Sequence, residues 1–161
     1  CIYFNYLFMK KTIIALYGRK DEGKSETLKC VCKLLLTNFP NSKSTPESIN
    51  YHNDILVIID TGFVKIGIES QGDPKSRLIC KDTVKKLANQ NCDIIVCATR
   101  THGETVCKVD KIANENDYYT LWLSSFWSPQ SPANALDRNV LNRIAAESII
   151  EVVKSLIKEQ L

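Results

Sequence analysis

The stretch TIIALYGRKDEGKSETLK, residues 12–29, changes character at its centre. Residues 12–17 are apolar and mostly β-branched or aliphatic, which predicts a buried strand. From residue 24 onward apolar side chains recur at helical spacing, and this pattern ends at residues 38–40, Asn-Phe-Pro. The pattern GxxxxGKS, residues 18–25, lies between these two parts. The stretch therefore predicts a strand, a glycine-containing loop and an amphipathic helix.

The loop has the composition of a phosphate-binding loop. Such loops hold phosphate oxygens mainly through backbone N–H groups and the positive end of the following helix, and glycine lets the backbone approach closely. We expect Lys24 to reach the terminal phosphates and Ser25 to ligate Mg²⁺. The acids within the loop, Asp21 and Glu22, are expected to point to solvent and so to avoid the anion.

Residues 12–38 resemble the Walker A motif of the P-loop NTPases, and the whole chain is similar to small stand-alone P-loop proteins. The resemblance implies an α/β fold of three layers, with a mostly parallel sheet between helices and the nucleotide at the carboxyl ends of the strands. It also implies ATP and Mg²⁺ as cofactors. The nucleotide-binding residues that it implies are Gly18, Arg19, Lys20, Asp21, Glu22, Gly23, Lys24, Ser25 and Glu26.

Apolar runs and amphipathic stretches alternate along the rest of the chain, which is typical of a layered α/β domain. A short turn at residues 60–62 separates the first two of the later strands. A turn that short forces antiparallel pairing, because a parallel connection needs a dozen or more residues. We therefore predict an antiparallel edge hairpin on the sheet, and a long polar loop at residues 40–53. The later strands are predicted at residues 54–60, 63–69, 93–99 and 118–125.

Three helices are predicted after the hairpin. The first begins at Asp73 and Pro74, an N-cap acid followed by proline at the first helical position. Thr101 and Glu104 have the spacing of a capping box and open the second. The last begins at residues 131–132, Ser-Pro. Its apolar stripe is predicted to include Leu136, Val140, Ile144, Ile149, Val153 and Leu156.

The family resemblance implies an acid at the end of a neighbouring strand, bound to Mg²⁺ directly or through water. Asp60 ends one strand of the hairpin and Glu69 ends the other. Because the two strands are antiparallel, these ends lie at opposite edges of the sheet, and one acid alone can face the loop. The second strand leads through a helix into strand 93–99, and a right-handed crossover makes these two strands parallel. Glu69 is therefore favoured as the metal-associated acid, with Asp60 as the alternative.

Three polar residues follow the predicted strand ends. The resemblance implies that Gln71 orients a water or senses the γ-phosphate. Asp73 assists the metal or caps a helix, and Arg100 is a sensor cation or a surface arginine. The predicted catalytic residues are thus Lys24, Glu69, Gln71 and Arg100, and the predicted metal-associated residues are Ser25, Glu69 and Asp73.

The preferred base is predicted from a missing motif. GTP-binding members of the family carry Asn-Lys-x-Asp soon after a strand, whereas the nearest string, residues 107–110, reads CKVD and lies in a predicted helix. ATP is therefore favoured over GTP. Phe126 and Trp127 are available to stack on the base, and ordinary core or surface packing is the alternative.

Composition indicates one globular domain. The chain has 161 residues and a net charge of +3, and its lysines are spread along the sequence, which argues against a nucleic-acid partner. Because Met9 is the single methionine, residues 1–8 are interpreted as an upstream extension and residues 9–161 as the domain. The seven cysteines are odd in number and lie mostly in apolar segments, which favours a reduced, cytoplasmic setting. No apolar run approaches the ~18 residues of a membrane span.

Taken with the resemblance, these observations predict a Mg-dependent ATPase that acts as a switch or accessory to a protein partner. Two alternatives remain open. One is a small-molecule kinase, although the expected lid at residues 40–53 has Lys43 alone among basic residues. The other is a nucleotide-regulated binding module with negligible turnover.

Overall fold

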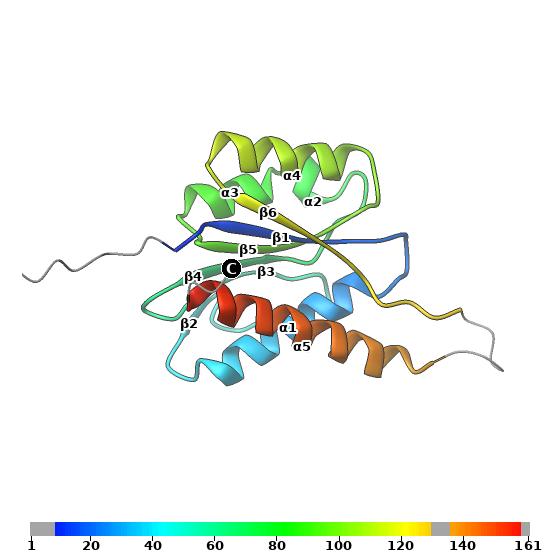
Figure 1. Ribbon diagram of the computed structural model, residues 1–161, viewed down its shortest axis with the longest axis horizontal. Helices are drawn as coiled ribbons and strands as arrows, with labels where there is room; N and C mark the ends of the chain where they lie inside the picture. The colour runs from blue at the N-terminus through cyan, green and yellow to red at the C-terminus, as the bar shows by residue number, and fades with distance from the viewer. Residues whose placement is uncertain (1–8, 130–135, 159–161) are drawn as a thin grey trace, which may run out of the picture.

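A six-stranded mixed sheet lies between two layers of helices (Figure 1). The computed structural model describes residues 9–129 and 136–158. The strands are β1 (Thr12–Tyr17), β2 (Lys43–Thr45), β3 (Leu56–Asp60), β4 (Lys65–Glu69), β5 (Ile94–Thr99) and β6 (Tyr119–Ser124). The helices are α1 (Lys24–Asn38), α2 (Arg77–Cys80), α3 (Thr83–Asn89), α4 (Glu104–Glu115) and α5 (Arg138–Ile157).

The strand order is β2-β3-β4-β5-β1-β6. β1 pairs in parallel with β5 and β6, and β4 pairs in parallel with β5. β3 runs antiparallel to both β4 and β2. The predicted α/β class and the antiparallel hairpin are therefore confirmed.

The position of the hairpin differs from the prediction, because β2 continues the sheet beyond β3. The hairpin is therefore not the edge, and residues 40–53 are not one uninterrupted loop. β2 consists of three residues, Lys-Ser-Thr, none of them buried. A strand so short and polar carries no apolar alternation that a sequence pattern could reveal.

The two faces of the sheet bury two separate cores. Ile14 and Leu16 of β1 pack on the side of α1 and α5, whereas Ile13 and Ala15 pack on the side of α2, α3 and α4. Side chains alternate in this way because successive residues of a strand point to opposite faces. All six residues of β5 are buried, so this strand reads as a continuous apolar run.

Helix α1 begins and ends where the sequence predicts, at Lys24 and Asn38. The helix predicted from Asp73 begins instead at Arg77 and is divided in two. Asp73 is engaged in an ion pair with Arg100. Asp82, with a φ of 51°, interrupts the helical path between α2 and α3. The residues of the predicted apolar face, such as Val84 and Leu87, are nevertheless buried.

The start of α4 is also formed differently. Its N-cap is Gly103, and no side chain caps the helix, so the capping box predicted from Thr101 and Glu104 is wrong. The Thr101 hydroxyl instead contacts the ring of His102 at 3.0 Å. The Thr105 hydroxyl accepts the N–H of Arg100 at 3.0 Å, which ties the end of β5 to the helix.

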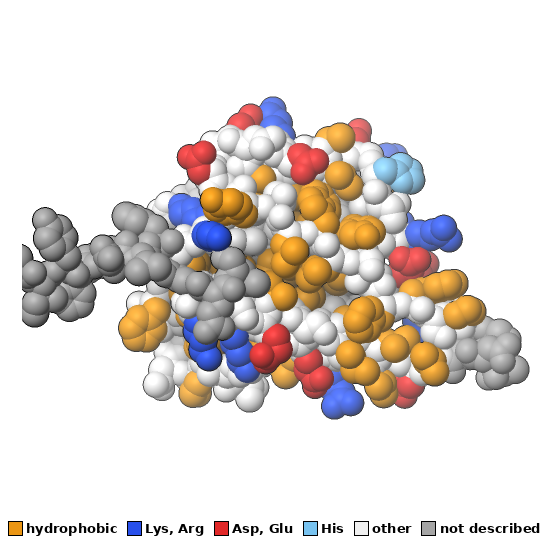
Figure 2. Space-filling model, in the orientation of Figure 1, with side chains coloured by type: hydrophobic (Ala, Val, Ile, Leu, Met, Phe, Trp, Pro, Cys, Tyr) orange, Lys and Arg blue, Asp and Glu red, His pale blue; other side chains and the backbone are white. Residues whose placement is uncertain are grey.

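The start predicted for the last helix, residues 131–132, lies outside the described residues. In the described part, α5 begins at Arg138, and the Asp137 carboxylate caps it by accepting two backbone N–H groups. The C-terminal half of the predicted stripe is buried, but Val140 and Ile144 are each 40% exposed and Leu136 precedes the helix. Apolar side chains gather over this region on the face seen in Figure 2. Among the described residues, no helix combines the length and apolar character needed to cross a membrane.

Candidate functional site

The loop between β1 and α1 turns sharply at residues 21–23. Asp21 has a φ of 59° and Gly23 a φ of 80°, both in the left-handed region. Gly23 is the N-cap of α1, and a Cβ atom at this position would overlap the side-chain oxygen of Asn142. Glycine is therefore required at position 23 by its backbone angle and by the close approach of α5.

Lys24 folds back over the loop that precedes it. Its ammonium group donates hydrogen bonds to the carbonyl oxygens of Gly18, at 3.0 Å, and Arg19, at 2.5 Å. Lys24 is 7% exposed. Burial lowers the pKa of its ammonium group, and repulsion from Arg100 acts in the same direction. The loop thus encloses a positive charge that has lost most of its water.

The two acids of the loop behave differently. Asp21 is exposed, as expected. Glu22 is half-buried, and its carboxylate accepts the backbone N–H of Arg19 at 2.6 Å. The expectation that both acids point to solvent therefore does not hold for Glu22. Its carboxylate instead occupies one of the N–H donors of the loop.

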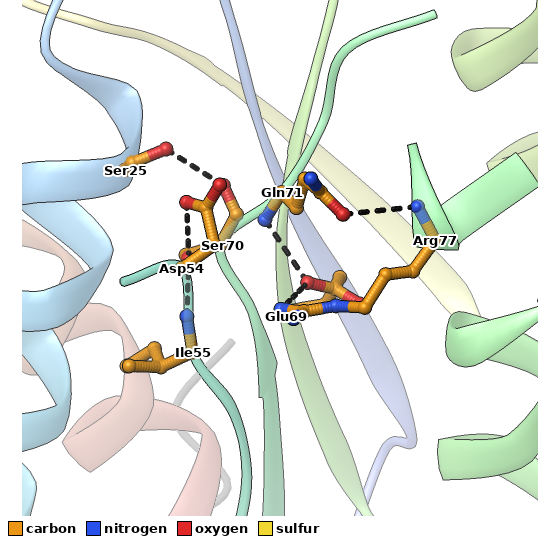
Figure 3. A network of polar contacts seen from close by, with 7 residues as sticks. All are labelled: Ser25, Asp54, Ile55, Glu69, Ser70, Gln71 and Arg77. Atoms are coloured by element: carbon orange, nitrogen blue, oxygen red, sulfur yellow. Dashed lines mark hydrogen bonds and ion pairs between the residues drawn. The ribbon is translucent and has the colours of Figure 1, made fainter. Parts of the chain in front are cut away.

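Ser25 is connected to Asp54 through Ser70 (Figure 3). The Ser25 hydroxyl donates to the carbonyl oxygen of Ser70 at 3.0 Å. The Ser70 hydroxyl donates to the Asp54 carboxylate at 2.9 Å and accepts the N–H of Ile55 at 2.8 Å. Asp54 precedes β3, so the antiparallel direction of β3 brings it to the carboxyl end of β4. Asp60, at the other end of β3, pairs with Lys65 at the opposite edge of the sheet.

Glu69 does not lie beside Ser25, which corrects the position predicted for it. Along β4, Ile68 packs against the core of α1 and α5, so the next side chain, that of Glu69, projects to the opposite face. There it is fully buried, and its two oxygens accept hydrogen bonds from the Arg77 guanidinium at 2.8 and 3.2 Å. The carboxylate also accepts the N–H of Gln71 at 3.0 Å.

The residues that follow β4 and β5 do come together. Gln71 and Asp73 line the same cavity as the loop residues. The Asp73 carboxylate forms an ion pair with the Arg100 guanidinium at 2.8 Å. Both charges influence Lys24, with Arg100 lowering and Asp73 raising the pKa of its ammonium group. In this arrangement Asp73 compensates Arg100 and does not cap a helix.

One wall of the cavity comes from the start of α5, which was not predicted to contribute to the site. Arg138, Asn139 and Asn142 line this wall. The Arg138 guanidinium donates to the backbone carbonyl of Asp21, and the Asn142 side chain accepts from the Thr27 hydroxyl at 3.4 Å. No local pattern marks these residues, since Thr27 and Asn142 are 115 positions apart.

The cavity enclosed by these segments has a volume of about 330 Å³. Its walls are the loop with the start of α1, Asp54 before β3, residues 70–73 and the first two turns of α5. Polar and charged side chains dominate the lining, which suits a small polar ligand more than an apolar one.

The remaining predicted residues, apart from Glu26, lie outside the cavity lining. Arg19 and Lys20 are exposed, and Glu26 lines the cavity while forming an ion pair with Lys29 at 2.7 Å. Phe126 and Trp127 are 44% and 52% exposed and do not line the cavity. Their predicted role in stacking on a base stays a prediction.

Comparison with known proteins adds no family assignment to this geometry. A scan of the chain against protein-family models found no match, and searches of curated proteins and of solved structures found none either.

Proposed function

We propose that this chain is a P-loop protein that binds Mg-ATP and hydrolyses it, acting as a switch or accessory to a protein partner. One observation carries the proposal: the GxxxxGKS loop joins a buried strand to a helix and closes one end of a polar cavity. The backbone N–H groups of the loop and the start of α1 would hold phosphate oxygens. Lys24 would exchange its two carbonyl partners for the terminal phosphates.

The residues around Ser25 fit a magnesium ion. Mg²⁺ in nucleotide sites takes oxygen ligands, commonly one or two protein groups together with phosphates and waters. The Ser25 hydroxyl and the Asp54 carboxylate, joined through Ser70, provide such oxygens at the cavity wall. When bound, the ion would neutralise charge that develops on the phosphates. Asp54 thus replaces Glu69 in the proposed metal site.

Gln71 lines the cavity, whereas Arg100 does not and is linked to it through Asp73. Gln71 belongs to residues 70–73, which form one wall of the cavity. Arg100 is compensated by Asp73, so it adds less positive charge to the site than an unpaired arginine would. The choice of ATP over GTP rests on the sequence, which lacks Asn-Lys-x-Asp after a strand.

The test is calorimetric titration with Mg-ATP. Hydrogen bonds to charged groups contribute ~1.5–3 kcal/mol, so Lys24→Ala should weaken binding roughly tenfold to a hundredfold. Lys43→Ala removes an equal charge from exposed β2 and should leave the affinity unchanged. Equal affinity of wild type and Lys24→Ala would refute the proposal.

Turnover is measured separately, as phosphate released from ATP or GTP without an acceptor. Tight Mg-ATP binding with no release of phosphate would replace the ATPase by a nucleotide-regulated binding module. Phosphate transfer that requires an added small molecule would favour a kinase.

A further inference from the structure

Strand β6 forms one edge of the sheet. It is the last strand in the order β2-β3-β4-β5-β1-β6, and among the described residues it pairs with β1 alone. At its start, the backbone N–H of Tyr119 donates to the carbonyl oxygen of Lys11 at 2.8 Å. Just past its end, the backbone N–H of Ser125 donates to the carbonyl oxygen of Tyr17 at 3.2 Å. The odd-numbered residues of β6 therefore direct their backbone groups toward β1.

The even-numbered residues of β6 direct their backbone groups the other way. Backbone groups alternate in direction along a strand, so the N–H and C=O groups of Thr120, Trp122 and Ser124 point outward from the sheet. Unpaired donors and acceptors in a row of this kind are a template for pairing with another strand.

The two edges of the sheet differ in how well they resist such pairing. At the opposite edge, β2 has three residues, includes Lys43 and is followed closely by Pro46. Short length, lysine and proline are the features by which proteins keep an edge strand from pairing. β6 has six residues, Tyr-Thr-Leu-Trp-Leu-Ser, with no charged side chain and no proline. The β6 edge therefore lacks the protection that the β2 edge has.

β6 is complementary to a second copy of itself. In an antiparallel pair, residues that exchange hydrogen bonds must both direct their backbone groups toward the partner strand. Placing Trp122 opposite Trp122 of a second copy meets this requirement and sets Thr120 opposite Ser124. Leu121 then lies opposite Leu123 in the intervening pairs. In this register every outward N–H and C=O group of β6 gains a partner.

The same arrangement covers exposed aromatic side chains. Tyr119, at the start of β6, is 62% exposed, whereas Phe126 and Trp127, just past its end, are 44% and 52% exposed. Antiparallel pairing brings the start of one β6 beside the end of the other. An aromatic side chain buries ~150–250 Å², so these three offer roughly 300 Å² per copy. That is a large share of the ~800 Å² that each partner buries in a specific interface.

Further apolar surface lies on the same side of the molecule. In the orientation of Figures 1 and 2, β6 crosses the front of the sheet, and apolar side chains gather along its course and over the start of α5. Val140 and Ile144 of α5 are among these exposed side chains. The surface around the β6 edge is therefore apolar enough to favour association.

We propose that this protein forms a symmetric dimer in which the β6 strands of two copies pair antiparallel and join the two sheets into one. Each copy has one such edge, so the pairing closes at the dimer and does not continue into a filament. The protected β2 strands then form both outer edges of the joined sheet. This inference goes beyond the proposed function and does not depend on nucleotide binding.

The oligomeric state is measured by sedimentation velocity over a range of protein concentrations, and wild type is expected to shift from monomer to dimer. Two double variants test the register, because the exposed side chains of Thr120 and Ser124 lie opposite each other across the dimer axis. Thr120→Lys with Ser124→Lys places like charges in contact, whereas Thr120→Lys with Ser124→Glu places opposite charges there. The second variant should associate at least ~10-fold more tightly than the first.

The comparison reports on the contact between copies. Within one copy, positions 120 and 124 are separated by ~13 Å along the strand, so their charges influence each other little. Phe63→Lys is the control, because Phe63 is 95% exposed at the turn between β3 and β4 and should not affect association. Circular dichroism verifies that each variant is folded. If Thr120→Lys with Ser124→Lys does not fold, Thr120→Pro takes its place, since it removes an outward donor and no bond to β1.

Hydrogen exchange locates the interface. In the dimer, the backbone N–H groups of Thr120, Trp122 and Ser124 should exchange more slowly than in the monomer. The N–H of Leu121, which points toward β1, should change little. This alternation along one strand is expected of edge pairing and of no contact made by side chains alone.

Three outcomes would overturn the inference. The first is a wild-type protein that stays monomeric at every concentration. The second is a dimer that is equally stable in both double variants, because its interface would then lie elsewhere. The third is slow exchange of the outward N–H groups already in the monomer, which would mean that another segment of the same chain covers the edge. None of these outcomes bears on Mg-ATP binding, so the proposed function is tested separately.

Discussion

Glu22 is the residue at which the loop departs most from what its glycines and Lys24 predict. A carboxylate inside a phosphate-binding loop opposes an incoming anion by charge and also occupies a backbone donor, the N–H of Arg19. Asp21, its neighbour, is exposed and therefore better screened by water. Under the proposed function, the Glu22 carboxylate must release the N–H of Arg19 before that donor can bind a phosphate.

We therefore expect Glu22→Gln to bind Mg-ATP more tightly than wild type. Two like charges about 4 Å apart in water repel by about 1 kcal/mol, which corresponds to roughly a fivefold change in affinity. Asp21→Asn makes the same change of charge at the exposed position and should alter the affinity less than about twofold. Calorimetry of the two variants checks this expectation. A marked loss of affinity in Glu22→Gln would instead mean that the carboxylate assists binding.

Among the elements, β3 decides which acid can serve the site. It carries an aspartate near each end, and because it runs antiparallel to β4, Asp54 lies at the cavity and Asp60 at the far edge. Glu69 ends β4 at the correct edge but on the wrong face of the sheet for α1. An acid can therefore reach Ser25 only if it lies at the edge of the sheet where β4 ends and on the face that α1 covers.

This geometry gives a prediction for two chemically identical substitutions. Asp54→Asn should depress Mg-dependent hydrolysis at least ~10-fold, because it removes the charge proposed to hold metal-bound water. Asp60→Asn should leave hydrolysis within about twofold of wild type. Phosphate release measured over a range of Mg²⁺ concentrations checks both. If turnover is absent, the Mg²⁺ dependence of ATP affinity provides the same comparison. Loss of activity in Asp60→Asn alone would contradict the placement of the metal.

Local patterns predicted the elements that depend on neighbouring residues. The loop and α1 follow from residues 12–38, and the hairpin follows from the length of its turn. The edge on which Glu69 lies was also predictable. Its face was not, because alternation along β4 tells which residues share a face and does not tell which face α1 covers. The position of Asp54 was predictable in the same way, because the start of an antiparallel strand lies beside the end of its neighbour.

Features that depend on distant packing had no signal in the sequence. Asn142 approaches Gly23 only because α5 packs beside α1 (Figure 1). The division between α2 and α3 depends on the left-handed conformation of Asp82, which aspartate adopts only occasionally. The hydrogen bonds from Arg77 to Glu69 likewise form only because the start of α2 lies beside the end of β4.

For the whole molecule, the cavity is a meeting point of four segments that are far apart in the chain. A ligand that bridges them favours the folded state, because the unfolded chain cannot present them together. At a free ATP concentration of about 100 times Kd, the stabilisation is about 2.7 kcal/mol. For a protein of this size that corresponds to a rise in Tm of about 5 to 10 °C.

Thermal unfolding with and without Mg-ATP measures this rise. Lys24→Ala at the same ATP concentration should show a much smaller shift, while Lys43→Ala should behave as wild type. A shift that is equal in all three proteins would indicate that ATP binds elsewhere.

The order in which the segments are synthesised adds a further consequence of the wall formed by α5. A ribosome completes every strand of the sheet before it reaches Arg138, Asn139 and Asn142. Chains fold progressively as they emerge, with their N-terminal parts first. The nascent protein therefore contains the loop between β1 and α1 long before it contains the α5 residues that complete the cavity. The capacity to bind a small molecule in this cavity is therefore acquired only after the described strands of the sheet have been synthesised.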